Sequence, residues 1–312
     1  MRHLVRGLVA VAFAVAAGCS RTGVASPAAS GGPITAPTAS PCASNRSAPP
    51  GESTQTVAVA SVSRSWVEYV PAGYDGGTTR PVVITLHGLG SDGTQQLHAT
   101  GWKTIADRDN VVVLSPNALG TPARWDLVAP RTVNADVDFV RAMITSVTER
   151  LCVAPRVSLN GMSNGSAFAA TLACALGDQV RAVAFVATTY QPRECGRTSP
   201  ITVVAFHGTE DKVVPYSGGR SEVLPIVVPA VDSGIVDWAY SDGCTIKPTE
   251  QQLSPEVAKR SFPGCRGGST VDLYTIAGGG HTWPGGPVSE KFGRTTTEIN
   301  ATEVMWKAFS RT

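Results

Sequence analysis

The feature that most constrains this sequence is the pentapeptide Gly-Met-Ser-Asn-Gly at positions 161–165. A short run suited to a buried strand begins at Val157 and leads into it, and an Ala- and Leu-rich segment suited to a helix follows it. Strand, sharp turn and helix in this order form a nucleophile elbow, which would expose Ser163 above a sheet. The two glycines leave room for the strand and the helix to pack around a strained turn. The pentapeptide alone also fits an ordinary strand-to-helix turn with a capping serine. The rest of the sequence is needed to decide between this turn and a nucleophile elbow.

The body of the chain alternates between strand-like and helix-like segments. Apolar, β-branched runs predict strands at 56–61, 66–70, 81–87, 111–115, 180–187, 201–206 and 271–276, of which the first two pair antiparallel. Helical spacing predicts a helix between Asn134, as its N-cap, and Leu151, and the helix after Ser163 is expected to stop at Gly177. Further helices are expected at 228–240 and 299–309. This alternation predicts a single α/β domain over residues 51–312, with a doubly wound, mostly parallel sheet and its active site at the carboxyl ends of the strands.

The first 50 residues are not expected to join that domain. Basic residues precede an apolar run over 8–17, which is too short to span a bilayer, and Gly18-Cys19 follows. This pattern predicts a signal peptide over residues 1–18 with a lipidated Cys19, and plain secretion is the alternative. The stretch before Cys19 resembles a bacterial lipobox, with Ala16 in place of the usual large aliphatic residue. Residues 19–50 are rich in Ser, Ala, Pro and Thr and predict a flexible linker.

The cysteine count indicates the cellular compartment, and the charge balance limits the expected binding partners. Of seven cysteines, six remain once Cys19 is assigned to the lipid, and an even number outside the cytosol favours disulfides. The expected pairs are Cys42–Cys152, Cys174–Cys195 and Cys244–Cys265, although six cysteines allow fifteen pairings. No Cys-x-x-Cys or His-x-x-x-His spacing predicts a metal site. The 26 basic and 24 acidic residues nearly balance and form no basic stripe, so nucleic acid is not an expected partner.

A serine hydroxyl needs a base, and the base needs an acid that fixes its tautomer. After a nucleophile elbow the chain order is serine, acid, histidine, and only two of the five histidines, His207 and His281, follow Ser163. If Asp211 is the acid, the base must be His281, which lies among glycines just after a predicted strand. Glu210 is the alternative acid. His207 is expected to be a hydrogen-bonded structural residue that holds the Asp211 loop.

The remaining candidate residues surround this triad. The oxyanion hole requires two backbone amides, and we expect them from Leu89, in the glycine-rich loop after the strand at 81–87, and from Asn164. Trp102, Trp125 and Trp283 each lie near one of these loops in the sequence and are candidate walls of a substrate pocket. Burial in the core is the alternative for each of them.

Four motifs together resemble one known family. They are Leu-His-Gly at 86–88, the pentapeptide at 161–165, His-Gly-Thr-x-Asp-x-Val-Val-Pro-Tyr at 207–216 and Gly-Gly-Gly-His-Thr-Trp-Pro-Gly-Gly at 278–286. Together they are similar to the polyhydroxybutyrate depolymerase-like esterases, a group that includes acetylxylan and feruloyl esterases and lipid-anchored esterases of the bacterial envelope. The resemblance extends from about Cys42 to the C-terminus. It implies an α/β-hydrolase fold, no cofactor, the triad Ser163, Asp211 and His281, and the oxyanion donors named above. Many relatives have additional glycines after the His-Gly pair, where this chain has Leu89, so the acyl preference stays open.

These observations predict a serine carboxylesterase outside the cytoplasm, either lipid-anchored or secreted. It would act as a monomer on short-acyl or aryl esters, free or linked to polysaccharide, through an acyl-enzyme. Its only expected membrane contact is the lipid. A short-chain polyester hydrolase and a peptidase are alternatives within the hydrolases, and the peptidase is disfavoured because no segment suggests a large gating domain. From another class, a catalytically silent envelope lipoprotein could bind a ligand on the same scaffold, although the intact Ser, Asp and His argue against it.

Overall fold

The computed structural model describes residues 42, 46–192, 195–288 and 290–312. These residues belong to one compact unit, residues 38–312. The predicted signal peptide, Cys19 and most of the predicted linker lie outside the described residues. Within the described ranges, no helix has both the length and the apolar character that a membrane span requires.

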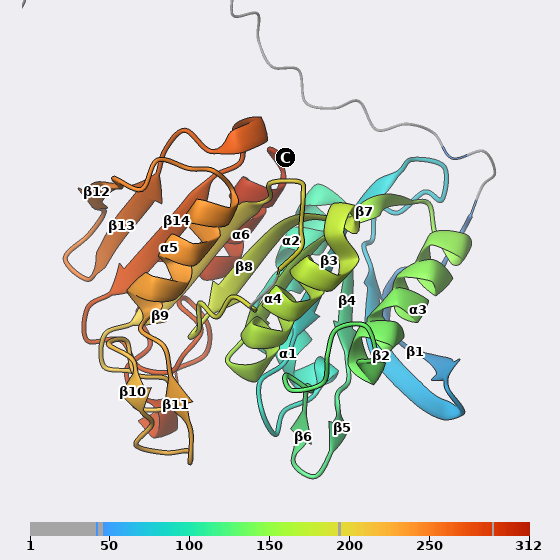
Figure 1. Ribbon diagram of the computed structural model, residues 1–312. Helices are drawn as coiled ribbons and strands as arrows, with labels where there is room; N and C mark the ends of the chain where they lie inside the picture. Colours follow the sequence, from blue (N-terminus) through green and yellow to red (C-terminus); the bar gives the residue numbers. More distant parts are fainter. Residues whose placement is uncertain (1–41, 43–45, 193–194, 289) are drawn as a thin grey trace, which may run out of the picture. The chain divides into compact units, whose positions relative to one another are not determined.

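The described residues form a ten-stranded sheet with the strand order β1-β2-β4-β3-β7-β8-β9-β14-β13-β12 (Figure 1). Its strands are β1 (Gly51–Val59), β2 (Val62–Val70), β3 (Arg80–Leu86), β4 (Val112–Pro116), β7 (Val153–Met162), β8 (Val180–Val186), β9 (Thr202–Gly208), β12 (Thr249–Gln252), β13 (Val257–Phe262) and β14 (Val271–Ile276). The six strands from β4 to β14 in this order are parallel, and the pairs beyond them at both edges are antiparallel. The predicted doubly wound, mostly parallel sheet is therefore confirmed.

Helices cover both faces of this sheet. They are α1 (Gly93–Ala99), α2 (Trp102–Asp109), α3 (Ala135–Arg150), α4 (Asn164–Leu176), α5 (Val231–Ser241) and α6 (Ala301–Phe309). Helices α3, α4 and α5 lie on one face of the sheet and α1, α2 and α6 on the other (Figure 1). The buried side chains of the two groups pack in two separate apolar layers against the sheet. The 3₁₀ turns at Gly177–Gln179, Arg266–Gly268 and Glu290–Phe292 complete the helical segments. Two short hairpins, β5 (Leu119–Gly120) with β6 (Ala123–Arg124) and β10 (Gly219–Arg220) with β11 (Val227–Val228), lie outside the sheet.

The helix ends follow the predicted capping signals. The side chain of Asn134 accepts hydrogen bonds from the amides of Asp136 and Val137 and so begins α3. Gly177 ends α4 with a φ of 54°, a conformation that a side chain would strain. These local signals place the ends of both helices, and α4 in turn fixes the turn that precedes it.

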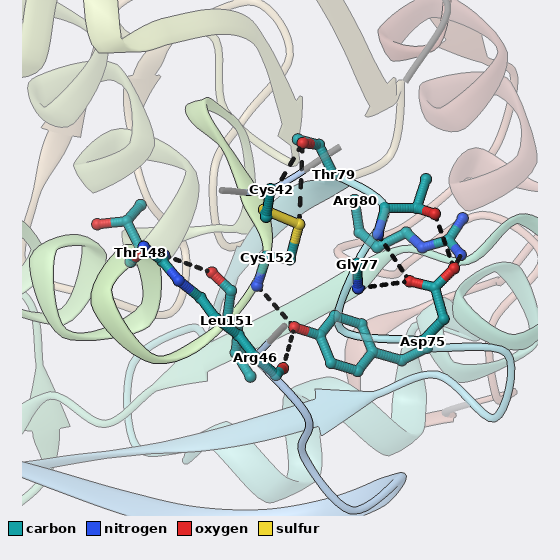
Figure 2. Close-up of a disulfide and its surroundings, with 11 residues drawn as sticks. Cys42, Arg46, Asp75, Gly77, Thr79, Arg80, Thr148, Leu151 and Cys152 are labelled. Carbon is teal, nitrogen blue, oxygen red and sulfur yellow. Dashed lines mark hydrogen bonds and ion pairs between the residues drawn. A yellow bond between two sulfur atoms is a disulfide. The ribbon is translucent and has the colours of Figure 1, made fainter. Parts of the chain in front are cut away.

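The structure contains the three predicted disulfides, Cys42–Cys152, Cys174–Cys195 and Cys244–Cys265. Cys42 and Arg46, which the sequence analysis placed in the linker, contact the domain (Figure 2). The Arg46 guanidinium donates to the carbonyl oxygens of Thr148 and Leu151 at the end of α3. These contacts tie this end of the predicted linker to the sheet domain.

Candidate active site

Ser163 lies in the turn between β7 and α4. Its φ of 55° and ψ of −118° are strained for a residue with a side chain. Its amide donates to Val186 O at 2.9 Å, which holds the turn against the neighbouring strand. A Cβ at Gly161 would lie 2.5 Å from Gly165, and one at Gly165 would lie 2.3 Å from Leu86 O. The two glycines of the motif are therefore needed for the close approach of strand and helix, as the sequence predicts.

Two adjacent parallel strands bring the predicted acid and base together. Asp211 follows β9, and His281 follows β14, which pairs with β9. The Nδ1 atom of His281 lies 2.7 Å from Oδ2 of Asp211, and both residues are buried. The other carboxylate oxygen of Asp211 accepts hydrogen bonds from the amides of Val213 and Val214. Glu210 is exposed, so the geometry pairs His281 with Asp211.

Ser163 and His281 line the same pocket, which has a volume of about 350 Å³. Leu89 and Trp283 belong to its wall, and Trp283 is fixed there by a hydrogen bond of 3.1 Å from its indole nitrogen to Thr302 Oγ1. Most of the remaining lining is apolar and comes from Met162, Val213, Val223, Leu224 and Phe292. Such a pocket, apolar with a few converging polar groups, suits a small organic ligand.

Comparison with known proteins supports the same fold. Over 222 residues the chain is 30% identical to feruloyl esterase B of Piromyces equi, a match that covers 68% of this chain and 41% of that protein. It is 29% identical to feruloyl esterase C of Emericella nidulans over 163 residues, covering 50% of this chain and 58% of that one. The chain thus spans less than two thirds of the length of either relative. No family model matches the sequence.

Among solved structures, an acetyl xylan esterase from Aspergillus awamori superimposes with a TM-score of 0.57 at 15% sequence identity. The match covers 74% of this chain and 94% of that one. The chain therefore has the α/β-hydrolase fold and is similar in sequence to the feruloyl esterases. The pocket lined by Ser163 and His281 therefore occupies the edge of the sheet at which sites of open α/β sheets form.

A second imidazole contacts Asp211, the predicted acid. The Nε2 atom of His207 lies 2.8 Å from Val214 O and 3.3 Å from Oδ2 of Asp211. Both oxygens accept only, so Nε2 carries the hydrogen and His207 donates. Burial by itself raises the pKa of Asp211, but the hydrogen bonds from His207 and His281 outweigh it and hold that pKa well below its usual range. His207 thus holds the Asp211 loop, the role expected from the sequence.

The loop after β3 holds the candidate oxyanion amide. The Nε2 atom of buried His87 accepts a hydrogen bond of 3.0 Å from the Ala118 amide, so its Nδ1 carries the hydrogen and donates to Gly88 O at 2.8 Å. Burial lowers the pKa of His87, which keeps this imidazole neutral. In a trans peptide the N–H points away from the C=O, so the bond to Gly88 O fixes the direction of the Leu89 amide. The amides of Leu89 and Asn164 have no hydrogen-bond acceptor among the described residues.

Trp102 and Trp125 do not line the pocket, so the prediction that they form its wall was wrong. Both are buried in the core, at 0% and 2% exposure. The indole nitrogen of Trp102 donates to Asn160 Oδ1, and that of Trp125 donates to the His87 carbonyl oxygen. Because each indole N–H finds an acceptor inside the protein, both rings can be buried completely. Trp125 also stacks on Phe168 of α4 at 4.8 Å, which fixes the loop beside the elbow.

The side chain of Asn164 has a role that the sequence analysis missed. Its Oδ1 accepts from the Trp125 amide at 2.7 Å, and its Nδ2 donates to the Trp125 carbonyl oxygen at 3.2 Å. This pair of bonds clamps the loop after β6 onto the start of α4. Within the described part of the chain, no three His, Cys, Asp or Glu residues cluster in a way that would hold a metal ion.

Proposed function

We propose that this α/β-hydrolase is a serine carboxylesterase that acts through an acyl-enzyme. The observation that carries the proposal is the pocket that the strained Ser163 shares with His281, whose ring is hydrogen-bonded to buried Asp211. Since Asp211 accepts from Nδ1, Nε2 of His281 is the nitrogen left to receive the hydroxyl proton. This is the arrangement that activates a serine as a nucleophile.

The reaction proceeds in two halves. Ser163 Oγ forms a bond to the ester carbonyl carbon while His281 takes its proton, which gives a tetrahedral oxyanion. The amides of Leu89 and Asn164 stabilise that oxyanion. The bond from carbon to the alcohol oxygen then breaks, and His281 returns the proton to the leaving alcohol. Water, deprotonated by His281, attacks the acyl-enzyme, releases the carboxylic acid and restores Ser163.

The proposed substrates are short-acyl or aryl esters, free or linked to a polysaccharide. A pocket of about 350 Å³ with mostly apolar walls suits a compact acyl group. The relatives named feruloyl esterase and the structural neighbour named acetyl xylan esterase point to the same class. We expect no cofactor, because the triad supplies the nucleophile, the base and the acid.

The proposed location is outside the cytoplasm, where the protein acts as a monomer. Three disulfides support an oxidising compartment. Membrane contact would come through a lipid on Cys19 only, and secretion without lipid is the alternative. Labelling with a radioactive fatty acid in a bacterial host, compared between the full chain and its Cys19→Ala variant, tests the anchor.

The decisive experiment measures hydrolysis of p-nitrophenyl esters from acetate to long acyl chains by the protein without its first 19 residues. Ser163→Ala is the matched variant. We expect activity to be highest on the short esters and to fall at least ~1,000-fold in the variant. Equal rates in both proteins, or none in either, would contradict the proposal and favour a silent ligand-binding protein.

A further inference from the structure

Gln96 of α1 is a buried polar side chain in the wall of the pocket. It is only 6% exposed, and it lies in the lining together with Ser163 and His281. Its side-chain nitrogen Nε2 donates to Thr85 Oγ1 at 3.0 Å. Its carbonyl oxygen Oε1 has no hydrogen-bond partner among the described residues, although it is not sealed off from solvent. Because Gln96 belongs to the lining, the pocket is the space from which a ligand can supply a partner to Oε1.

A chain of buried hydrogen bonds fixes which end of the Gln96 amide faces the pocket. The side chain of Asn160 donates through Nδ2 to Ile84 O, so its Oδ1 is the acceptor for Trp102 Nε1. Thr85 must then give its only hydroxyl hydrogen to Asn160 Oδ1, at 2.7 Å. The Thr85 oxygen can therefore only accept from Gln96, which must present its NH₂ group to it. Turning the amide over would bring two oxygens together, so Oε1 stays on the pocket side.

The hydroxyl groups of the other neutral polar side chains in the lining already donate hydrogen bonds within the protein. The hydroxyl groups of Thr100 and Thr282 donate to the carbonyl oxygens of Gln96 and Arg294, and Ser91 donates to the side chain of Gln95. The oxygens of these hydroxyl groups keep free lone pairs, but among the described lining residues Gln96 alone contributes a side-chain carbonyl oxygen, and that oxygen has no partner. Once a ligand displaces water from the pocket, a carbonyl left without a partner is costly, so a ligand that supplies a donor is favoured.

We propose that Gln96 determines substrate specificity by accepting a hydrogen bond from a hydroxyl group on the part of the ester that occupies the pocket. The favoured substrate has a largely apolar, compact body that carries one hydroxyl. The second N–H of the Gln96 amide can donate to the same hydroxyl, because a hydroxyl both donates and accepts. An ester that lacks the hydroxyl leaves Oε1 unpaired and is disfavoured. This inference rests on the proposed esterase function.

The test compares matched esters that differ by one hydroxyl. They are methyl 3-phenylpropanoate and its 3-hydroxyphenyl and 4-hydroxyphenyl counterparts. The quantity measured is the ratio of kcat/KM between a hydroxylated ester and the plain one, in the wild type, in Gln96→Met and in Gln95→Met. Methionine keeps the length of glutamine and removes its acceptor, and Gln95 is an exposed glutamine on the same helix.

We expect the wild type and Gln95→Met to prefer at least one hydroxylated ester about tenfold or more, and Gln96→Met to show a ratio within twofold of one. Equal rates on all three esters in the wild type, or an unchanged preference in Gln96→Met, would overturn the inference. If Gln96→Met does not fold, equal rates of the wild type on the three esters would still overturn the inference.

A binding measurement separates this inference from the proposed function. Ser163→Ala is titrated by calorimetry with 3-phenylpropanoate and with its two ring-hydroxylated forms. Tighter binding of a hydroxylated acid by about tenfold supports the role of Gln96 even if the wild type hydrolyses none of the esters. Equal binding of all three acids contradicts it, whatever the outcome for hydrolysis.

Discussion

The carboxylate of Asp211 accepts four hydrogen bonds, two from backbone amides and two from the imidazoles of His207 and His281. In the proposed mechanism this carboxylate serves both catalysis and stability, because its donors are satisfied only while it is ionised. Since the pKa of Asp211 is lower in the folded protein than its unfolded value of about 4, the group stabilises the fold above about pH 4. That contribution is lost progressively as the pH falls towards the folded pKa.

We predict that Asp211→Asn lowers kcat about 10³–10⁴-fold at pH 7, because an amide can hold His281 in the wrong tautomer. The variant should also unfold at a lower temperature at pH 7, and the gap from the wild type should narrow below about pH 4. Thermal unfolding between pH 3 and pH 8, beside turnover at pH 7, checks both. A gap that stays constant down to pH 3 would contradict the depressed pKa.

His207 is predicted to act on catalysis only through Asp211. His207→Met removes the donor at similar length, and we expect kcat to fall about tenfold with little change in KM, because the acid is no longer held in place. His207→Gln keeps an N–H donor and should restore kcat to within about threefold of the wild type. Steady-state kinetics of both variants test this prediction. If both variants lose the same activity, His207 contributes packing and not a hydrogen bond.

For single residues, the sequence predicts a role where the order of residues along the chain leaves few candidates. His281 follows from the small number of histidines after Ser163, and the structure places it beside Asp211. The tryptophans at 102 and 125 were misassigned, because proximity in sequence to a loop does not show which way an indole turns. Gln96 was not found at all, since a glutamine on a helix carries no signal until its hydrogen-bond partners are known.

Among the elements, the elbow depends on how closely α4 approaches the end of β3. A Cβ at Gly165 would lie 2.3 Å from Leu86 O and 2.4 Å from His87 O, so α4 or the loop after β3 would have to move. We predict that Gly165→Ala lowers the free energy of unfolding by about 3 kcal/mol and reduces kcat strongly, because that loop also holds Leu89.

Gly177→Ala, at the other end of α4, is the matched control. Its Cβ would meet nothing within 4 Å, and only the strained backbone, with φ 54° and ψ −122°, would cost about 1–2 kcal/mol. We expect this variant to keep its activity. Urea unfolding and turnover of the two variants distinguish a steric requirement at Gly165 from a general sensitivity of α4. Equal losses in both variants would contradict the steric account.

The elements that the sequence analysis missed are short or polar. The helices α1 and α2 have seven and eight residues, too few for a clear apolar period. The strand β12 consists of four exposed polar residues and becomes a strand by pairing with β13 at the edge of the sheet. By contrast, the buried parallel strands are continuous apolar runs, which is why most of the sheet could be predicted.

At the scale of the whole molecule, the Cys42–Cys152 disulfide closes a segment of 110 residues that contains the first four strands of the chain in the sheet. Around it, the hydroxyl of Tyr74 donates to Arg46 O at 2.8 Å and accepts from the Cys152 amide at 2.6 Å. Figure 2 shows Arg46 and the disulfide together on the domain. The start of the described chain is therefore held by a covalent bond and by partly buried polar contacts.

We predict that the double variant Cys42→Ser, Cys152→Ser lowers the free energy of unfolding by about 2–4 kcal/mol. Removing the Cys244–Cys265 pair, whose members are 21 residues apart, should cost about 1.5 kcal/mol less, because a shorter loop restricts the unfolded chain less. None of these four cysteines lines the pocket of Ser163, so kcat at 25 °C should stay within about twofold of the wild type in both double variants. Urea unfolding and ester hydrolysis measure the two effects separately. A loss of kcat in the Cys42 variant under conditions where it is still folded would show that the attachment of the N-terminal segment shapes the active site, and not stability alone.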